Sequence, residues 1–567
     1  MTWARWKPSL TGRAALTLAV WAPIYLALVY AAAFRQSATW DEPQHLTAGY
    51  LVRAAADYRF DPEHPPFLRL WAAWPIEPER IITSVPVAMR GESWLMLAQF
   101  GYCHEFLYRR NDADRLLNQA RAMNALWGVL LGGLLFAFAR QRFGDGSAIS
   151  ALLIYTIEPN LLAHAGLVTT DVGITAFVFG AVYFLWRWTG APTWGNAAGL
   201  VLFFVLAQIS KFTGILLIPM VGLGLLLAVL RGRVKVARAA GLAGLLLVST
   251  YAAIWAVYSF RYWPSPNTTE SLGVREMEIV RERVPHLARA VDWLADRRVL
   301  PNAYLEGFLL GQSKAKARAA YLAGRYSETG WWYYFPAAFL LKTPVTLLAL
   351  GGLGLYALGR RWRTSWADDV WLLVPVIVFM GTAITAKLNI GLRHVLPIYP
   401  FVILCAAGVV ARWWPTRRVE VWLVTGLAAV ELAMVYPHCL AFFNVLAGGP
   451  ARGGRYLVDS NLDWGQDLKR LKAWMDQRGV TQINLAYFGT AAPEYYGIRS
   501  IYLPGAPFFA EARLPQLPGY VAVSETNLRG VYLSEAGRAF YRPLLAREPI
   551  AQIGYSINVY WVDEPWW

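Results

Sequence analysis

Cysteine and the signatures of common soluble enzymes are scarce in this 567-residue sequence. It holds three cysteines, Cys103, Cys405 and Cys439, whose spacing fits neither a metal site nor a disulfide framework. A bridge between Cys103 and Cys439 would require both to face an oxidising compartment, and buried free thiols are the favoured interpretation. The sequence has no paired-histidine zinc motif, Walker loop or dinucleotide fingerprint, so a metalloprotease, an ATPase and a Rossmann enzyme lack support.

Acidic residues are also few relative to basic ones. The 37 Asp and Glu stand against 53 Lys and Arg, which gives a formal net charge of +16. In a soluble protein such an excess would suggest a nucleic-acid partner. Here 56% of the residues are hydrophobic, mean hydropathy is +0.34, and the basic residues gather in short clusters between long apolar runs. This pattern is typical of an integral membrane protein, and we expect no nucleic-acid partner.

Apolar runs of spanning or near-spanning length recur along most of the chain. Because about 20 residues cross the hydrocarbon layer, these runs predict about eleven transmembrane helices. The short runs near Gln208 are the weakest candidates. No internal repeat is evident. The runs cover residues 14–34, 120–139, 147–163, 172–188, 197–209, 212–230, 239–260, 335–358, 370–386, 395–411 and 419–436.

The short connections between the runs differ in their content of Lys and Arg. Basic short loops stay in the cytoplasm, and the basic clusters alternate consistently with a cytoplasmic N-terminus. Arg5, Lys7 and Arg13 precede the first run, which we interpret as a retained anchor rather than a cleaved signal peptide. All the candidate catalytic groups are then predicted on the opposite, outer face. The basic clusters lie at residues 140–142, 231–238, 360–363 and 412–418.

Three outer segments are too long to be simple turns. Residues 35–118 include two stretches, 40–58 and 65–74, whose mixed polarity predicts short helices at the membrane interface. Residues 261–334 form a second large loop. From residue 441 the composition changes, and we predict a small α/β domain over residues 441–567, after a membrane domain over residues 1–440. Its predicted elements are a strand and turn at 456–461, strands at 482–487 and 520–523, and an amphipathic helix at 466–477.

Two adjacent carboxylates, Asp41 and Glu42, follow the first apolar run. A carboxylate at the water boundary can act as a general base on a hydroxyl or an amine. The competing interpretation is a helix cap, because Asp41 precedes Pro43 in a typical first turn. Asp171 begins another apolar run and is open to the same two interpretations. In the loop of Asp41, paired prolines follow His64, which could donate or shuttle a proton or belong to a helix-start turn.

Three cations and a histidine stand at the predicted outer ends of helices, namely Lys211, Lys342, Arg393 and His394. Cations in such places could hold a phosphate through charge-assisted hydrogen bonds. For any one of them alone, snorkelling to lipid headgroups is the simpler explanation. Their common face favours the phosphate interpretation.

Taken in order, these stretches resemble the GT-C glycosyltransferases, specifically the bacterial relatives of the protein O-mannosyltransferases and the lipid A aminoarabinose transferases. The resemblance implies the GT-C fold and an inverting transferase. Such an enzyme would move a hexose or pentose from a polyprenyl-phosphate donor to a protein, lipid or glycan acceptor, on the outer face of the bacterial cytoplasmic membrane. The matching stretches are residues 41–43, 64–66, 170–172, 210–214, 330–336, 342–344 and 391–400.

The same resemblance implies roles for single residues. Asp41 looks like the base that faces the acceptor, Glu42 like its supporting carboxylate, and Asp171 like a second acid that orders the first loop. The cations and His394 are similar to groups that stabilise the leaving phosphate, where pre-placed positive charge lowers the barrier. Several relatives carry Lys where this chain has His64, so a phosphate-binding role there departs from the pattern.

Two other functions stay open at this point: a flippase or transporter of lipid-linked sugars, and a non-catalytic factor in the assembly of envelope glycans. A transporter would spread ionisable groups through the bilayer and repeat its halves, whereas here these groups gather at one face. A divalent cation could be held by Asp41, Glu42 and Asp171, but three dispersed carboxylates are insufficient evidence for one. The acidic segment at residues 463–467 could contact an acceptor, although a helix cap is favoured.

Overall fold

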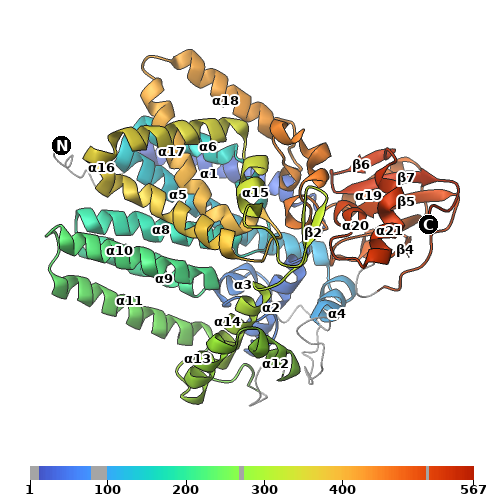
Figure 1. Cartoon of the computed structure of the whole chain (residues 1–567), viewed down its shortest axis with the longest axis horizontal. Coiled ribbons are helices and arrows are strands. Elements are labelled where there is room, and N and C mark those ends of the chain that lie inside the picture. The colour runs from blue at the N-terminus through green and yellow to red at the C-terminus, as the bar shows by residue number, and fades with distance from the viewer. Residues whose placement is uncertain (1–11, 78–98, 267–273, 506–509) are drawn as a thin grey trace.

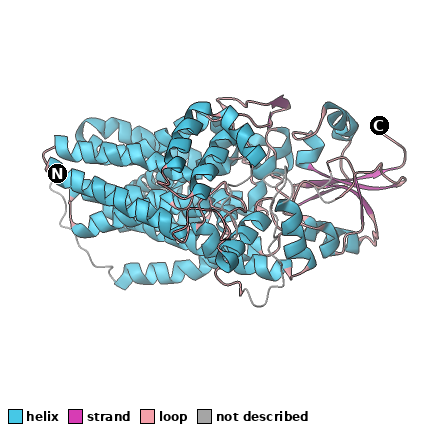
Figure 2. Ribbon diagram, turned by 90° about the horizontal axis from the view of Figure 1, so that it is seen from below, coloured by secondary structure: helices cyan, strands magenta, loops and turns pink. Residues whose placement is uncertain are grey.

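The helices of the computed structural model run mostly along the long axis of the molecule, and the C-terminal strands gather at one end of it (Figures 1 and 2). The first helix, α1 (Gly12–Ala33), begins near the opposite end. The structure describes residues 12–77, 99–266, 274–505 and 510–567. Of the basic residues predicted to precede the first span, Arg5 and Lys7 lie outside the described residues.

Within these described ranges, seven helical segments are long and apolar enough to cross a membrane. Their length and composition make the chain an integral membrane protein, as predicted. Three of them, α8, α17 with its leading turn, and α5, are the most buried inside the bundle. The seven are α1, α5 (Ala113–Phe143), α8 (Asp171–Gly190), η4 with α10 (Phe212–Leu230), α11 (Val236–Val257), α16 (Val345–Thr385) and η5 with α17 (Leu392–Trp413).

The difference from the predicted eleven spans has local causes. The run at 147–163 is divided into α6 (Asp145–Thr156) and α7 (Pro159–Ala165), because Glu158 caps α7 by accepting the Leu161 amide at 2.6 Å. Pro344 likewise separates α15 (Tyr334–Lys342) from α16, since the residue before a proline disfavours helix. α9 (Trp194–Gln208) and α18 (Arg418–Ala433) have 15 and 16 residues, less than a straight crossing needs.

The longest helix, α16, contains two of the predicted runs in 41 residues. If it were straight, its ends would be about 60 Å apart. Yet Asn461 accepts a hydrogen bond from Lys342, just before α16, and another, at 2.9 Å, from the Leu392 amide just after it. The element therefore folds back on itself (Figure 1). At the end of the bundle away from Asn461, Asp369 of α16 pairs with Arg142 and Arg361 at 2.6 and 2.7 Å.

Short helices cover the bundle at the end that carries the C-terminal strands. The two helices predicted in the first outer loop are present as α2 (Glu42–Ala55) and α3 (Phe67–Ala72). The second outer loop is also largely helical. Its elements are α12 (Val274–Arg283), α13 (Pro285–Asp296), α14 (Asn302–Lys314), β1 (Ala320–Leu322) and β2 (Arg325–Ser327). The first loop also contains α4 (Gln99–His104) and η3 (Glu105–Arg109), which precede α5.

The C-terminal part is an α/β unit, as predicted, with a five-stranded sheet in the order β4-β3-β5-β7-β6. β3 pairs in parallel with β4 and β5, whereas β7 pairs antiparallel with β5 and β6. Of the strand and turn predicted at 456–461, the turn is present as η9 (Asp459–Asn461), with Asp459 at φ +57°, but the strand is not formed over these residues. The other elements are α19 (Leu468–Gln477), β3 (Ile483–Ala486), β4 (Ser500–Tyr502), β5 (Gly519–Ser524), α20 (Glu525–Arg529), α21 (Glu535–Leu545), β6 (Ala551–Ile553) and β7 (Ile557–Val562).

The sheet shares a hydrophobic core with the outer loops of the membrane part. Leu46 of α2, Leu309 of α14, Leu471 of α19, Leu485 of β3 and Val559 of β7 are all fully buried in one cluster. The other face of the sheet packs against α21 in a separate cluster. The C-terminal unit is therefore docked firmly on the first outer loop, since burial of this apolar area holds the two together. The three cysteines are buried free thiols, as predicted.

Candidate active site

Asp41 stands at the start of α2, where the first outer loop turns into the helix. It occupies the N-cap position, but among the described residues its side chain makes no capping hydrogen bond. Its Oδ2 instead accepts a hydrogen bond from Nη1 of Arg393 at 2.6 Å, and 23% of the side chain is exposed. The capping interpretation therefore does not describe this carboxylate, which faces a cation instead.

A chain of four alternating charges passes through Arg393. Beyond Asp41, Nη1 of Arg393 lies 3.9 Å from Oδ2 of Asp171, and Oδ1 of Asp171 accepts a hydrogen bond from Nζ of Lys211 at 2.7 Å. The four residues come from four elements: α2, η5 (Leu392–Ile398), α8 and the turn before η4 (Phe212–Leu216). The structure thus brings together Asp41, Asp171, Lys211 and Arg393, which lie as many as 352 residues apart in sequence.

Three buried atoms of this group have spare hydrogen-bonding capacity. Within the described residues, Oδ2 of Asp171, Nε of Arg393 and Nε2 of His394 have no hydrogen-bond partner. Buried polar atoms are usually paired, so unpaired ones grouped in a site are suited to hold a ligand. His394 follows Arg393 directly, and its ring packs edge-on to Phe335 with centroids 6.2 Å apart.

Glu42 points the other way, into the protein, although it adjoins Asp41 in sequence. Its carboxylate is fully buried and pairs with Nε and Nη2 of Arg121 at 2.8 and 2.7 Å. The amides of Thr39 and Val168 also donate to it, at 2.8 and 2.9 Å. Burial alone raises the pKa of Glu42, but Arg121 and these amides more than offset it, so the pKa is lowered. The predicted supporting carboxylate is therefore a structural anchor for the loop that carries Asp41.

Replacing Glu42 with Gln should destabilise the whole outer loop. The change leaves the buried Arg121 guanidinium without a counter-ion, and we expect a loss of about 3–5 kcal/mol in the free energy of unfolding. Thermal unfolding of the purified protein in detergent measures it. Glu63→Gln is the matched control, since the Glu63–Lys314 pair is about one-third exposed and should be worth under about 1 kcal/mol.

The pH dependence of stability in the acid range gives a second test of the Glu42–Arg121 ion pair. Because the pKa of Glu42 is lower in the fold than in the unfolded chain, the unfolded chain binds more protons as the pH falls. The stabilisation that ionised Glu42 contributes is complete above its pKa in the unfolded chain, about 4.3, and is lost as the pH falls below that value. The stability of Glu42→Gln should therefore fall less between about pH 5 and 3 than that of the wild type. Equal slopes would contradict the role given to Glu42.

Lys342 also lies apart from the charge chain. Its ammonium is buried and donates to the backbone carbonyls of Leu440, Phe442 and Asn461, the first two at 3.0 and 2.9 Å. Burial lowers its pKa to about 7. With its donors occupied by carbonyls, this lysine ties the end of α15 to the C-terminal segment. Within the described part of the chain it forms no ion pair with Asp41 or Asp171.

His64 lies beside a second buried cluster, below α2. His45, one helical turn after Asp41, meets Oδ2 of Asp61 through Nδ1 at 2.8 Å, and Arg69 contacts the same oxygen at 3.1 Å. Burial alone would raise the pKa of Asp61, but Arg69 and His45 lower it well below its usual range. The His64 ring lies 5.6 Å from that of His45, and burial together with nearby Lys211 lowers its pKa well below the ordinary value. This direction favours the neutral form of the His64 imidazole.

The C-terminal segment reaches the charge chain, which the sequence did not predict. The indole of Trp464 lies against the Arg393 guanidinium, 4.3 Å from ring centroid to Cζ. The acidic residues around it have structural partners: Asp463 accepts the Thr526 amide at 2.8 Å, and Asp467 accepts from Ser556 at 2.7 Å. Asp467 precedes α19 without a capping hydrogen bond among the described residues, so the favoured cap is not formed.

Arg121 and Trp464 are the two important residues that sequence reasoning missed. A signal for Arg121 was present, because a charge inside the apolar stretch that became α5 is costly and needs a partner. For Trp464 the signal was partial: segment 463–467 was considered as an acceptor contact for its acidic residues, but nothing distinguished this indole among the 27 tryptophans of the chain.

The described residues contain no group of three or more His, Cys, Asp or Glu side chains that could hold a metal ion. The three carboxylates considered for a divalent cation each face a cationic side chain instead: Asp41 faces Arg393, Glu42 faces Arg121, and Asp171 faces Lys211.

Comparison with known families bears on the middle of the chain. Residues 114–256 match the family model described as dolichyl-phosphate-mannose-protein mannosyltransferase. This segment includes Asp171 and Lys211. The resemblance predicted from the motifs is confirmed there, and these residues carry the sequence of a glycosyltransferase family. No curated protein matches the chain.

Among solved structures, the crystal structure of ArnT from Cupriavidus metallidurans bound to undecaprenyl phosphate is 12% identical, with a TM-score of 0.46 over 96% of this chain and 98% of that chain. The apo state of the same protein is 14% identical, with a TM-score of 0.34 over 97% and 98%. The Archaeoglobus fulgidus oligosaccharyltransferase in complex with Zn and sulfate is 14% identical, with a TM-score of 0.44 over 90% and 68%.

Proposed function

We propose that this chain, whose residues 114–256 match a mannosyltransferase family, is an inverting glycosyltransferase that uses a polyprenyl-phosphate sugar as its donor. The observation that carries the proposal is the charge chain from Asp41 through Arg393 and Asp171 to Lys211. It offers one carboxylate as a base and two cations as phosphate ligands within a single site. A soluble or lipid-borne acceptor supplies the hydroxyl or amine.

In the proposed reaction, the acceptor oxygen or nitrogen attacks the anomeric carbon and its proton passes to Asp41. The bond from the anomeric carbon to the phosphate oxygen breaks, and the polyprenyl phosphate leaves as an anion. Arg393 and Lys211 stabilise the charge that develops on that phosphate. One displacement with one base inverts the anomeric carbon and needs no covalent intermediate on the protein.

The Asp41–Arg393 ion pair gives this site a way to couple donor binding to catalysis. Oδ2 of Asp41 accepts a hydrogen bond from Nη1 of Arg393 at 2.6 Å, so this oxygen is occupied and is not open to the acceptor. A donor phosphate that takes hydrogen bonds from Arg393 competes with Asp41 for it. The released carboxylate is then free to accept the acceptor's proton, so the base is activated when the donor is present.

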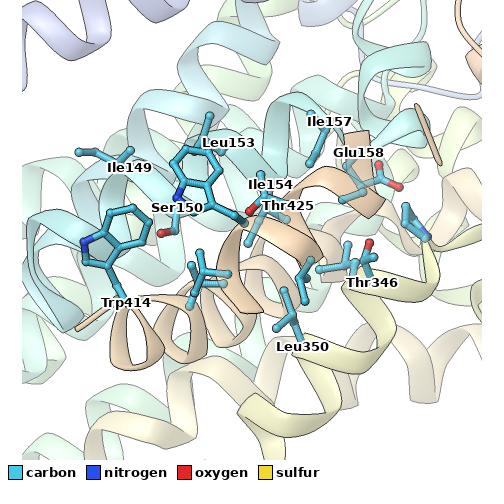
Figure 3. A pocket seen from close by; sticks show the side chains of 18 of the residues that line it. Ile149, Ser150, Leu153, Ile154, Ile157, Glu158, Thr346, Leu350, Trp414 and Thr425 are labelled. Carbon is cyan, nitrogen blue, oxygen red and sulfur yellow. The ribbon is translucent and has the colours of Figure 1, made fainter. Parts of the chain in front are cut away.

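An apolar cavity among the membrane helices supports a lipid-linked donor. Its volume is about 370 Å³, and it lies between α6, α16, α17 and α18 (Figure 3). Trp414 stands towards one end and Glu158 at the other, where α7 begins. The ring of His164, near the far end of α7, lies 6.2 Å from that of Trp464. A polyprenyl chain in this cavity would place its phosphate end towards the charge chain.

The same proposal sets the orientation in the membrane. Arg140 and Arg142, at the end of α5, lie at the end of the bundle away from Asp41, and basic clusters of this kind stay in the cytoplasm. The N-terminus is then cytoplasmic, and the site and the C-terminal unit lie outside the bacterial cytoplasmic membrane.

Sugar transfer by the purified protein in detergent tests this function. The protein is incubated with a set of polyprenyl-phosphate hexoses and pentoses and with protein, lipid and glycan acceptors, and the glycosylated product and free polyprenyl phosphate are quantified together. We expect both to appear in equal amounts, with the anomeric configuration inverted. Because detergent removes the membrane compartments, a transporter would give no product. Binding of the donors without turnover would indicate an assembly factor instead.

A further inference from the structure

A loop of the C-terminal segment is built into the first outer loop beside Asp41. The amide of Trp40 donates to the carbonyl of Trp464 at 2.8 Å. Ser37 makes two further bonds to the loop, from its amide to the Gln466 carbonyl at 3.0 Å and from Oγ to the Gly465 carbonyl at 2.8 Å. Backbone contacts of this kind fix the position of Trp464 relative to Asp41.

The loop can take this path because of Gly465. Its φ is +94°, and a Cβ there would lie 2.8 Å from Oη of Tyr487 and 2.9 Å from Cα of Gly489. Tyr487 donates to the Gly465 carbonyl at 2.6 Å, and the Trp464 amide donates to Oε1 of Gln466 at 2.8 Å. A position that only glycine adopts without strain thus directs the preceding indole towards the site.

The indole of Trp464 is 1% exposed, and the Arg393 guanidinium lies over its face, 4.3 Å from the ring centroid. The edge of the guanidinium meets Asp41 through Nη1, while Nε has no partner among the described residues. A cation over an indole face is held by the ring quadrupole without use of its N–H donors. The stack therefore fixes the plane of the guanidinium and leaves its donors available.

We propose that Trp464 is a positioning residue, through which the C-terminal unit holds Arg393 ready for the donor phosphate. The inference rests on the proposed function, in which that phosphate competes with Asp41 for Arg393. Once the ion pair with Asp41 opens, the indole stack keeps the plane of the guanidinium in place, while the carboxylate of Asp171 stays 3.9 Å from its Nη1. The C-terminal unit is then a part of the active centre.

Binding of undecaprenyl monophosphate to the full-length protein in detergent tests this role, alongside turnover with the donor. We expect Trp464→Met, which removes the aromatic face, to weaken binding and lower kcat by at least about tenfold. Trp464→Phe keeps an aromatic face and should stay within about fivefold of the wild type. Trp474→Met is the matched control, because Trp474 also stacks on an arginine, Arg478 at 5.1 Å, on α19; it should change binding by less than twofold.

The outcomes separate the inference from the function on which it rests. No binding of undecaprenyl monophosphate by the wild type would overturn the proposed function. Wild-type binding with equal binding by a folded Trp464→Met would overturn the inference alone, as would equal losses in the Met and Phe variants. If Trp464→Met does not fold, Trp464→Phe decides, because phenyl is a weaker partner for a cation than indole. A two- to fivefold loss of undecaprenyl monophosphate binding in Trp464→Phe supports the role. A loss no larger than that of Trp474→Phe refutes it.

Discussion

Asp41→Asn should leave the protein folded, leave it able to bind undecaprenyl monophosphate, and abolish sugar transfer. The amide has the shape of the carboxylate and can still accept a hydrogen bond from Arg393, now 2.6 Å away, so the loop should keep its path. It cannot accept the acceptor's proton, and loss of a general base typically costs about 10²–10⁴ in rate. Initial rates of product formation, with donor and acceptor saturating, measure the effect.

The control for this variant is the same substitution at another carboxylate, Asp114. Asp114 begins α5, is about one-third exposed and pairs with Lys469 at 2.8 Å. Asp114→Asn should keep its rate within about twofold of the wild type. Full activity in Asp41→Asn would exclude Asp41 as the base. Loss of lipid-phosphate binding together with activity would instead give Asp41 a purely structural role.

The pair Asp41 and Glu42 marks where prediction from the sequence stops. Both carboxylates were rightly placed at the start of a helix, because the preceding apolar run and Pro43 fix that start. Successive residues at a helix start point in directions about 100° apart. Which of the two faces a ligand depends on Arg121, 79 residues away, and this contact has no sequence pattern of its own.

The cations divide in the same way. Lys211 and Lys342 were both predicted as phosphate ligands, Lys211 at the start of a helix and Lys342 inside an apolar run. In the structure Lys211 meets a carboxylate, Asp171, whereas Lys342 is enclosed by backbone carbonyls of the C-terminal segment. Periodicity and charge count predict helices and their sides, because these follow from the bilayer. The partners of a buried charge depend on how distant segments pack, so they become known only with the fold.

Removal of the Arg393 side chain is the second change expected to have a large effect. Arg393→Ala should weaken the binding of undecaprenyl monophosphate by at least about tenfold and lower kcat by about 10²–10³, the usual cost of removing a donor aimed at developing negative charge. Arg393→Lys keeps the charge but loses the planar fork of donors, so its binding and its kcat should lie between those of Arg393→Ala and those of the wild type. Isothermal titration in detergent and steady-state kinetics measure both quantities.

Two features make this prediction sharper than a general loss of charge. The first is a matched control: Arg412 lies in the last turn of α17, at the end of the helix away from Arg393. Arg412→Ala should change neither lipid-phosphate binding nor kcat by more than about twofold. The second feature is the competition for Arg393. Arg393→Ala also frees Asp41 from its ion pair, so a variant that binds the lipid phosphate normally and turns over faster would mean that Arg393 only restrains the base. Loss of both binding and turnover, with partial recovery in Arg393→Lys, would place the donor phosphate on this guanidinium.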